Sequence, residues 1–311
     1  MRSFDMKRWF LAGPAMTLGL LLSGCGGGGD GVASTPPPTY TKLADLTGNR
    51  TFQSAGAHLT IANGQFTDHS IQKYGAGVTI AYNASSDSYT LTAPDGATDT
   101  FSGSSSPPPG YTPAPNQIAL SNSTGAGGTF VLTVPSVNGI ALSYTAQGSW
   151  NHFGNNVLSA YFGVSGVPTI AGDMPRNGTA TYQTSVAGLA VRTDGAYNLD
   201  TTSTGTFSAD FGAGTVATTL HLAGVPSSAT PFLPGPGAQP SADFGSYTGT
   251  GTITSGSPGF SGTLASMASS SVVANGEFAG AFFGPQAKEM GYGFYVASTG
   301  FSAQGTVVGT K

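Results

Sequence analysis

The chain has 311 residues, a formal net charge of −4 and only 8% charged side chains, while 39% of its residues are hydrophobic. A charge so sparse and mildly acidic argues against a nucleic-acid-binding protein, which needs clustered lysine and arginine. The 48 glycines argue against long helices, because each destabilises a helix interior by about 1 kcal/mol relative to alanine. The apolar fraction still suffices for a core, so short strands and turns are expected.

The first 24 residues have the pattern of a signal peptide. Three basic residues precede an apolar stretch over 9–22, which is short for a membrane span of about 20 residues. The stretch ends in Leu22-Ser23-Gly24-Cys25, a run that resembles the lipobox of bacterial lipoproteins. The resemblance implies cleavage before Cys25, acylation of its sulfur and new amino group, and a membrane anchor. Ordinary secretion, with an incidental cysteine, is the alternative.

Cys25 is the only cysteine, so no disulfide can form within the chain. Four glycines follow it in place of an aspartate, and by resemblance to sorted lipoproteins this favours the outer membrane. Residues 25–39 form a tether whose glycines are flexible and whose three consecutive prolines are stiff. The sequence therefore predicts a folded body held away from the bilayer.

Residues 40–172 are expected to form a β-rich domain. The segments 78–82 and 88–92 flank a polar turn and predict a hairpin. Further strands are expected at 130–134, 142–144 and 161–162. A proline-rich loop is expected at 105–115, since proline cannot donate to a sheet. Trp150 is expected to anchor the core of this domain.

Residues 173–311 are expected to form a small closed barrel. Strands are predicted at 177–182, 186–192, 206–211, 216–222, 247–253, 260–264, 272–283, 292–297 and 301–308, with a proline-rich connector at 225–240. The segment 216–222 alternates apolar and polar side chains with the period of a half-buried strand. The strands are short and no apolar outer face repeats, so the barrel is expected outside the lipid rather than across it.

The most informative segment is GEFAGAFFGPQAKEMGYGF, residues 276–294. Pro285 forces Gly284 out of the helical region and cannot continue a ladder, so the strand must end there. Residues 286–290 predict one helical turn, which Gly291 ends before the next strand. Phe278, Phe282 and Phe283 are expected in the barrel core or at its rim. The motif is expected to be a structural corner, made by Gly276, Phe278, Gly280, Phe283, Gly284, Pro285, Glu289 and Gly291.

Three segments together resemble the transferrin-binding-protein-B-like surface lipoproteins. MPRNGTATY (174–182) is similar to the opening strand of the family's barrel, and the 276–294 motif is similar to its terminal hairpin. SYTAQGSWNHFG (143–154) resembles the strand that leads into that barrel. The resemblance implies an all-β protein, with an N-terminal handle-like domain over 40–172 and an eight-stranded antiparallel barrel over 173–311.

The resemblance also implies a noncatalytic lipoprotein of the bacterial outer membrane, displayed on the cell surface. Its partners are the membrane, through Cys25, and an unknown protein or small-molecule ligand bound by barrel-end and handle loops. Transferrin capture is not implied, because the chain has room for one handle and one barrel and lacks long charged loops. A structural envelope lipoprotein without a dedicated ligand is the alternative of a different class.

Two chemical alternatives remain open in the sequence. His58 and His69 are potential haem ligands, although the four histidines lack metal-ligand spacing. Glu277 and Glu289, the only glutamates, suggest a glycosidase-like carboxylate pair. No nucleophile motif or cofactor fingerprint accompanies them. We therefore expect no enzyme activity, no cofactor and no metal site.

Overall fold

The structure is a computed structural model that describes residues 37–62, 65–109, 111–122, 128–154, 156–199, 201–227 and 241–311. The predicted signal peptide, Cys25 and most of the tether and of the 225–240 connector lie outside these residues. The described chain is built from β-sheets, which confirms the predicted all-β class. None of its helical segments has the length and apolar character that a membrane-crossing helix needs.

The N-terminal part, the handle, contains three sheets. Its strands are β1 (Arg50–Phe52), β2 (Ser54–Ala62), β3 (Gln65–Gln72), β4 (Thr79–Asn83), β5 (Ser88–Thr92), β6 (Thr98–Ser102), β7 (Gln117–Ser121), β8 (Thr129–Thr133), β9 (Ser136–Val137), β10 (Ile140–Ala141), β11 (Thr145–Gly154) and β12 (Val157–Gly166). A six-stranded sheet has the order β3-β2-β12-β11-β8-β7, and a four-stranded sheet has the order β1-β4-β5-β6. Strands β9 and β10 form a small hairpin of their own.

The two larger handle sheets pack face to face. Trp150 of β11 is only 2% exposed, stacks on Tyr161 with 4.8 Å between ring centroids, and meets side chains of the four-stranded sheet. Its role as a core anchor is therefore confirmed. The predicted hairpin is β4–β5, where the Asn83 side chain accepts hydrogen bonds from two backbone N–H groups of the turn. This local side-chain cap stabilises the turn that the polar residues predicted.

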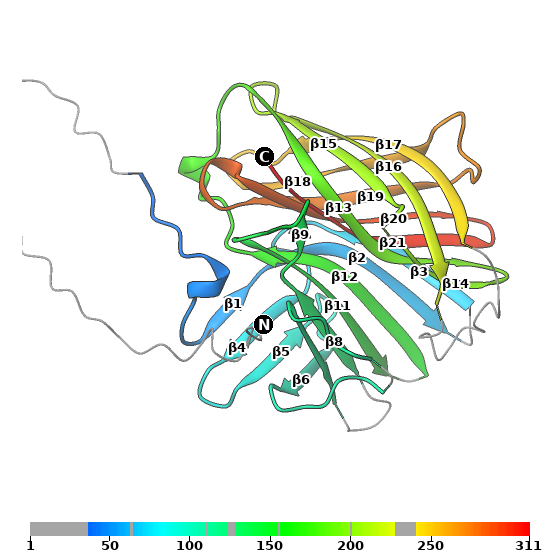
Figure 1. Ribbon diagram of the computed structural model, residues 1–311, viewed down its shortest axis with the longest axis horizontal. Helices are drawn as coiled ribbons and strands as arrows, with labels where there is room; N and C mark the ends of the chain where they lie inside the picture. Colours follow the sequence, from blue (N-terminus) through cyan, green and yellow to red (C-terminus); the bar gives the residue numbers. More distant parts are fainter. Residues whose placement is uncertain are drawn as a thin grey trace, which may run out of the picture.

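The C-terminal part is a closed antiparallel barrel, drawn above the handle in Figure 1. Its strands are β13 (Thr179–Arg192), β14 (Gly195–Leu199), β15 (Thr204–Asp210), β16 (Thr215–Pro226), β17 (Ala242–Ile253), β18 (Gly259–Ser266), β19 (Asn275–Phe283), β20 (Glu289–Ser298) and β21 (Phe301–Thr310). Pairing of β13 with β21 closes the barrel. Strands β14 and β15 share one position between β13 and β16, so eight strand positions complete the ring.

Several observed strands, among them β2, β3 and β14, were not predicted, and the prediction also differs from the structure in two further places. The segments 177–182 and 186–192 form one strand, β13, because the ladder with β21 runs unbroken from Gln183 to Arg192 despite the polar side chains near its start. Residues 142–144 are not a strand. The N–H groups of Ser143 and Tyr144 are instead bound by a carboxylate of the barrel, described below.

The barrel is apolar inside and polar outside. Aromatic rings fill its interior, among them those of Phe207, Phe260, Phe278 and Tyr292. The opposite faces of β15 to β18 expose mainly short polar side chains: Thr206, Thr219, Thr248, Thr250 and Thr263. A barrel that faces lipid has the reverse arrangement, so this barrel is a packed core with a hydrated surface.

The barrel rests on the six-stranded sheet through small residues. A Cβ atom added to Gly293 of β20 would lie 2.5 Å from Cα of Gly56 in β2. Ala55 and Val164 of the handle pack nearby against Ala281 and Val308 of the barrel. The two backbones therefore approach as closely as glycine allows, and β2 and β12 run directly beneath β20 and β21 (Figure 1).

We expect Gly293→Ala to lower the free energy of unfolding by about 1–3 kcal/mol, because the added methyl group overpacks the contact with Gly56. Gly172→Ala is the matched control, since its added Cβ meets no atom within 4 Å. Chemical denaturation of both variants measures the difference. Equal stabilities would show that the close approach does not constrain the fold.

Candidate functional site: the handle–barrel junction, the interdomain cleft and the barrel end

The 276–294 motif forms the corner where the barrel meets the handle. Strand β19 ends at Phe283, and Gly284 follows with φ of +70°. A Cβ atom on Gly284 would lie 2.4 Å from the ring of Tyr144 in the handle. Glycine is therefore required at this position both by the backbone conformation and by the close approach of an aromatic ring.

The linker between the two domains pairs with this corner. The Gly284 N–H donates to the Val167 carbonyl at 2.9 Å, and the Thr169 N–H donates to the Phe282 carbonyl at 3.0 Å. The Thr169 hydroxyl donates to the Gly284 carbonyl at 2.7 Å. The linker thus adds a short antiparallel segment to the end of β19.

Asp173, in the 3₁₀ turn Ala171–Asp173, binds the next part of the corner. Its carboxylate accepts hydrogen bonds from the Gln286 N–H at 2.9 Å, from the Gln286 side chain and from the Tyr40 hydroxyl at 2.9 Å. Burial opposes the charged form of Asp173, but these donors outweigh it and lower the pKa of this carboxyl. Burial, together with the Asp173 carboxylate, raises the pKa of Tyr40 to about 12.

Glu289 is the first residue of β20 and is only 2% exposed. Its two carboxylate oxygens accept the backbone N–H groups of Ser143 at 2.7 Å and Tyr144 at 2.9 Å. Hydrogen bonds to a charged group contribute about 1.5–3 kcal/mol, and a buried carboxylate without them is strongly unfavourable. A barrel side chain therefore replaces the strand partner that this stretch of the handle lacks.

The corner is tighter than the sequence indicated. The predicted helical turn over 286–290 is a 3₁₀ turn, Pro285–Ala287, in which Gln286 and Ala287 have positive φ. The next strand begins at Glu289, because the backbone of this residue pairs with Thr310 of β21 and its carboxylate binds the N–H of Ser143 in the handle. Gly291 therefore lies inside β20, where it packs against Val164, and does not end a helix.

The remaining motif residues lie in β19. Phe278 is fully buried inside the barrel, whereas Phe283 is fully buried between the barrel and the handle. Gly280 pairs with Phe260 on one side and Tyr292 on the other, and a Cβ atom on it would clash with the Gly291 carbonyl and with Cα and Cβ of Tyr292. Gly276 lies near the start of the strand, opposite Val296.

The two glutamates do not form a carboxylate pair. Glu277 and Glu289 lie at opposite ends of the β19–β20 hairpin, six strand positions apart. At about 3.3 Å per residue, their backbones are roughly 20 Å apart, far beyond the roughly 5–9.5 Å that separates glycosidase carboxyls. The glycosidase hypothesis therefore has no geometric support.

The haem hypothesis also lacks its ligand pair. His58 is paired with Ser70, and His69 with Leu59, which places the two rings on opposite faces of the β2–β3 ladder. His58 stacks on Tyr161, whereas His69 contacts the Ser302 hydroxyl of the barrel at 2.7 Å. Within the described ranges, no three His, Cys, Asp or Glu residues come together as metal ligands.

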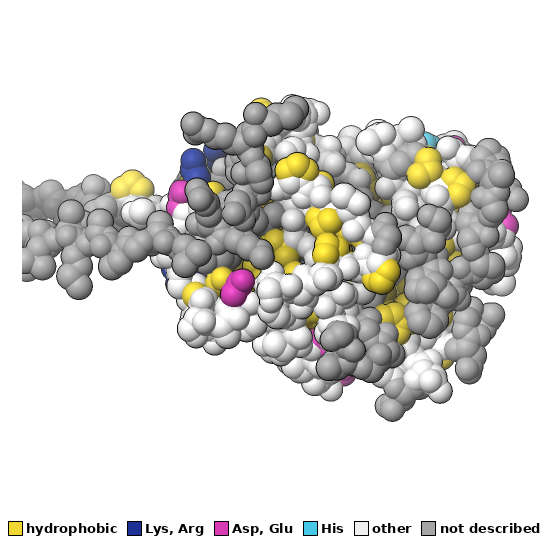
Figure 2. All heavy atoms as spheres, turned by 60° about the horizontal axis from the view of Figure 1, so that its bottom comes forward, with side chains coloured by type: hydrophobic (Ala, Val, Ile, Leu, Met, Phe, Trp, Pro, Cys, Tyr) yellow, Lys and Arg dark blue, Asp and Glu magenta, His cyan; other side chains and the backbone are white. Residues whose placement is uncertain are grey.

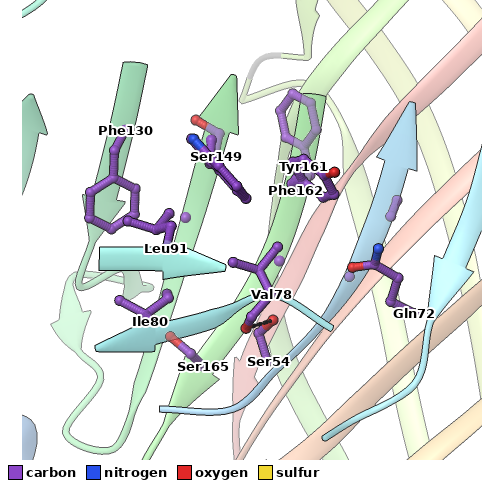
Figure 3. A pocket seen from close by; sticks show the side chains of 15 residues that line it. Ser54, Gln72, Val78, Ile80, Leu91, Phe130, Ser149, Tyr161, Phe162 and Ser165 are labelled. Carbon is purple, nitrogen blue, oxygen red and sulfur yellow. Dashed lines mark hydrogen bonds between the residues drawn. The ribbon is translucent and has the colours of Figure 1, made fainter. Parts of the chain in front are cut away.

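The cavity drawn in Figure 3 lies inside the handle sandwich and has a volume of about 30 Å³. Val78, Ile80 and Leu91 of one sheet face Tyr161 of the other across it. A cavity of this size holds about one water molecule. It is a packing defect of the core rather than a ligand site.

A larger cleft, of about 250 Å³, opens between the handle and the barrel. Its floor is the side of the six-stranded sheet away from the sandwich core, at β7, β8 and β11, and its roof is Ala187, Gly188 and Thr306 of the barrel. The Thr306 hydroxyl donates to Oε1 of Gln147 at 3.0 Å and joins roof to floor. This is the interdomain cleft.

Next to Thr306 on the same face of β21 lies Gln304, which is 1% exposed. Neither atom of its amide group has a hydrogen-bond partner among the described residues. Two unpaired buried groups of this kind cost about 1–3 kcal/mol each. On this face of β21, Ser302 and Thr306 each form a hydrogen bond with the handle. The side chain of Gln304, which lies between them, forms none with the described residues.

The barrel end remote from the corner, called here the loop end, carries exposed apolar side chains. Val273 is 76% exposed in the β18–β19 loop, and Met267 and Val225 are also exposed at this end. At the same end of the barrel, Arg192 binds Asp194 at 2.7 Å and lies over the rings of Tyr197 and Phe244. Figure 2, in which the bottom of Figure 1 is turned toward the viewer, shows few charged side chains among polar and apolar ones.

The described chain consists of a β-rich handle and one closed antiparallel barrel. The buried carboxylate of Glu289 joins the two parts. A comparison with family models matches residues 174–311 to the C-lobe and N-lobe beta barrels of Tf-binding protein B. Residues 174–311 are therefore similar to the barrels of this family, which confirms the predicted resemblance. No curated protein matches it.

The chain is also similar to solved structures of transferrin binding proteins and of a surface lipoprotein. Transferrin binding protein B of Haemophilus parasuis Hp5, a double mutant, is 18% identical with a TM-score of 0.47, covering 84% of this chain and 45% of that one. The isotype 1 protein of serogroup B Neisseria meningitidis is 16% identical, with a TM-score of 0.44 and coverage of 83% and 43%. A surface lipoprotein is 14% identical, with a TM-score of 0.36 and coverage of 84% and 97%. The chain thus spans less than half the length of the first two.

Sequence reasoning expected binding by barrel-end loops but missed the cleft and the exposed apolar side chains of the loop end. Gln117 is the first residue of β7, and Gln147 lies in β11 next to the buried Ala146, and a polar residue within a strand is a signal for a special position. The signal has little force by itself, because only the register of β7, β8 and β11 places these side chains side by side. The contact of Glu289 with residues 143–144 had no sequence signal at all.

We expect Glu289→Gln to lower the free energy of unfolding by about 2–3 kcal/mol, because its amide offers one acceptor to two backbone N–H groups and adds a donor facing them. Glu277→Gln is the matched control, on the same hairpin but only partly buried. Urea denaturation gives both values. A Glu289→Gln protein as stable as the control would show that the hydrogen bonds of Glu289 to Ser143 and Tyr144 do not stabilise the fold.

Stability is also expected to fall as the pH is lowered from about 7.5 to 5. Burial lowers the pKa of His69 below its ordinary value, although the charge of Asp68 opposes this shift. Its unfolded form then binds protons before the folded form does, so stability present above about pH 6.5 is lost below it. Burial shifts the pKa of His58 in the same direction.

The pH series is measured by urea denaturation of the wild type, of His69→Gln and of a His221→Gln control in the barrel. The loss of stability with falling pH should be smaller in His69→Gln, with a residual slope from His58. An identical slope in all three proteins would show that His69 is not the group responsible.

Proposed function

We propose that this protein is a noncatalytic binding lipoprotein, anchored to the outer membrane through Cys25 and displayed on the cell surface. It binds a protein partner or a small solute through the loop end of the barrel and the handle. The observation that carries the proposal is the match of residues 174–311 to the barrels of Tf-binding protein B. The domains in this proposal are the signal peptide 1–24, the tether 25–39, the handle 40–172 and the barrel 173–311.

Binding at the outside of the barrel is supported by its filled interior. Aromatic side chains occupy the space that an internal ligand would need. The exposed Val273, Met267 and Val225 share the loop end, where an apolar contact patch with few charges suits a protein partner. Transferrin, which the relatives' names give as their ligand, is the first partner to test.

Binding without catalysis is supported by the state of the acidic side chains. Glu289 is committed to two backbone N–H groups, and Asp173 is committed to Tyr40 and Gln286. Neither carboxylate is available as a general base. The family motif, from Gly276 to Gly291, therefore acts as the corner that fixes the barrel to the handle.

The anchor is supported by the way the chain enters the handle. Leu43 and Leu46 are buried against Val134 and Ala146 and fix the start of the folded body. Cys25 lies about a dozen residues before the described chain begins, and a tether of that length suffices to separate the body from a membrane.

Cys25→Ser is expected to leave an uncleaved, unacylated precursor, because only a thiol accepts the lipid. Mass spectrometry of the membrane fraction should show acylated mature protein for the wild type and for the neighbouring control Gly26→Ser. Normal acylation and cleavage of Cys25→Ser would overturn the lipoprotein assignment.

Display and binding are tested on intact cells. A nonspecific protease should degrade the wild-type protein before the outer membrane is broken, and full protection would remove the surface claim. Val273→Asp with Met267→Asp should weaken the capture of transferrin or of another partner at least tenfold, by placing charges in an apolar patch. Ala217→Asp, on the exposed outer face of β16, is the control and should leave capture unchanged.

A further inference from the structure

The interdomain cleft is a separate feature from the loop end, and its floor has a regular composition. Gln117, Thr133 and Gln147 are paired in one row across β7, β8 and β11. Val131, Ser149 and Phe162 form the adjacent row across β8, β11 and β12. A polar row therefore lies beside a mixed row on one face of the sheet.

Beneath the barrel the same two rows continue with small apolar residues in place of polar ones. Beyond Gln147 the first row continues through Val164 to Ala55, and beyond Phe162 the second continues to Ala57. These small apolar residues are buried, most of them against the barrel. The polar side chains thus begin where the barrel no longer touches the sheet, and they line the cleft.

The polar groups of the cleft are oriented as hydrogen-bond donors. Oε1 of Gln117 accepts the Tyr111 hydroxyl at 2.9 Å and the Ala114 N–H at 3.0 Å. Oε1 of Gln147 accepts the Thr306 hydroxyl at 3.0 Å. With both oxygens occupied, the two Nε2 groups, which have no partner among the described residues, are left to donate. The Ser149 hydroxyl adds a group that both donates and accepts.

Two aromatic side chains, Tyr111 and Phe162, line the cleft, and none of its lining residues in the described part of the chain is charged. Tyr111 is 37% exposed at the mouth, and Phe162 is partly exposed on the floor. Without a counter-charge, a charged ligand would lose hydration and gain no ion pair. The cleft is somewhat smaller than the roughly 300–1,000 Å³ of sites for drug-sized ligands. It therefore suits a small, uncharged molecule rich in hydroxyl groups.

We propose that the interdomain cleft binds an uncharged sugar unit. The amide donors, the Ser149 hydroxyl and the Thr306 side chain meet its oxygen atoms, and Tyr111 and Phe162 cover its apolar ring faces. The proposal rests on the noncatalytic binding role proposed above, for which it names one solute class, but it uses a surface distinct from the loop end.

The test uses the full mature chain in a detergent without a sugar headgroup. Saturation-transfer NMR and calorimetry are recorded with the methyl glycosides of glucose, galactose and N-acetylglucosamine, and with an uncharged blocked tripeptide for comparison. A dissociation constant of about 1 mM corresponds to about −4 kcal/mol and is measurable at these concentrations. At least one glycoside is expected to bind, and the tripeptide is not.

Two cleft variants and one matched control locate the site. Tyr111→Ala removes the wall at the mouth, and Ala187→Leu fills the space below the roof. Each should weaken glycoside binding roughly tenfold, with unchanged melting temperature. Ala217→Leu, the same change on the exposed face of β16, should leave binding unaltered.

The absence of binding by all three glycosides, binding of the tripeptide in their place, or equal binding by the cleft variants and the wild type would each overturn the proposal. Partner capture through the loop end is measured separately. If the wild-type protein captures a partner but binds no glycoside, only the inference about the cleft is overturned. If it neither captures a partner nor binds a glycoside, the proposed function is overturned as well.

Discussion

The buried carboxylate of Glu289 is the interaction on which the arrangement of the two domains depends. It accepts hydrogen bonds from two backbone N–H groups of the handle that have no strand partner. These hydrogen bonds in turn offset the desolvation cost of burying the carboxylate. The contact joins residues 145 positions apart in the chain. Because the carboxylate fixes the backbone of Tyr144, it also fixes the position of the Tyr144 ring. This ring lies so close to Gly284 that no side chain fits there.

The close contact beside this junction explains the cleft. Gly293 lets the barrel touch β2 at backbone distance, so the interface is tightest at β2, β12 and β20. Because the barrel surface is curved, it contacts the sheet along one line only, and the gap between the two widens with distance from that line. The interdomain cleft lies on the β11, β8 and β7 side of that contact, and polar side chains occupy the sheet there. The likeness of the barrel to a family of binding proteins therefore does not by itself place the binding surface.

Much of the fold could be predicted because strands and turns have local signals. The alternation in 216–222 identified β16, and the Gly284-Pro285 step marked the end of β19 to the residue. The errors fell where tertiary contacts override local pattern. Polar residues near the start of β13 stay in the strand because β21 pairs with them, and residues 142–144 leave the strand state because a carboxylate replaces the ladder.

The sequence by itself determined the strand-rich class, the barrel family and the position of the corner, since alternation, glycine and proline act over a few residues. Only the tertiary structure decided what Glu289 binds, that His58 and His69 face apart, and that Gln117, Thr133 and Gln147 form one row. These outcomes depend on strand register and on contacts between distant segments. A shift of register by one residue reverses every side chain, and no local pattern specifies which strands become neighbours.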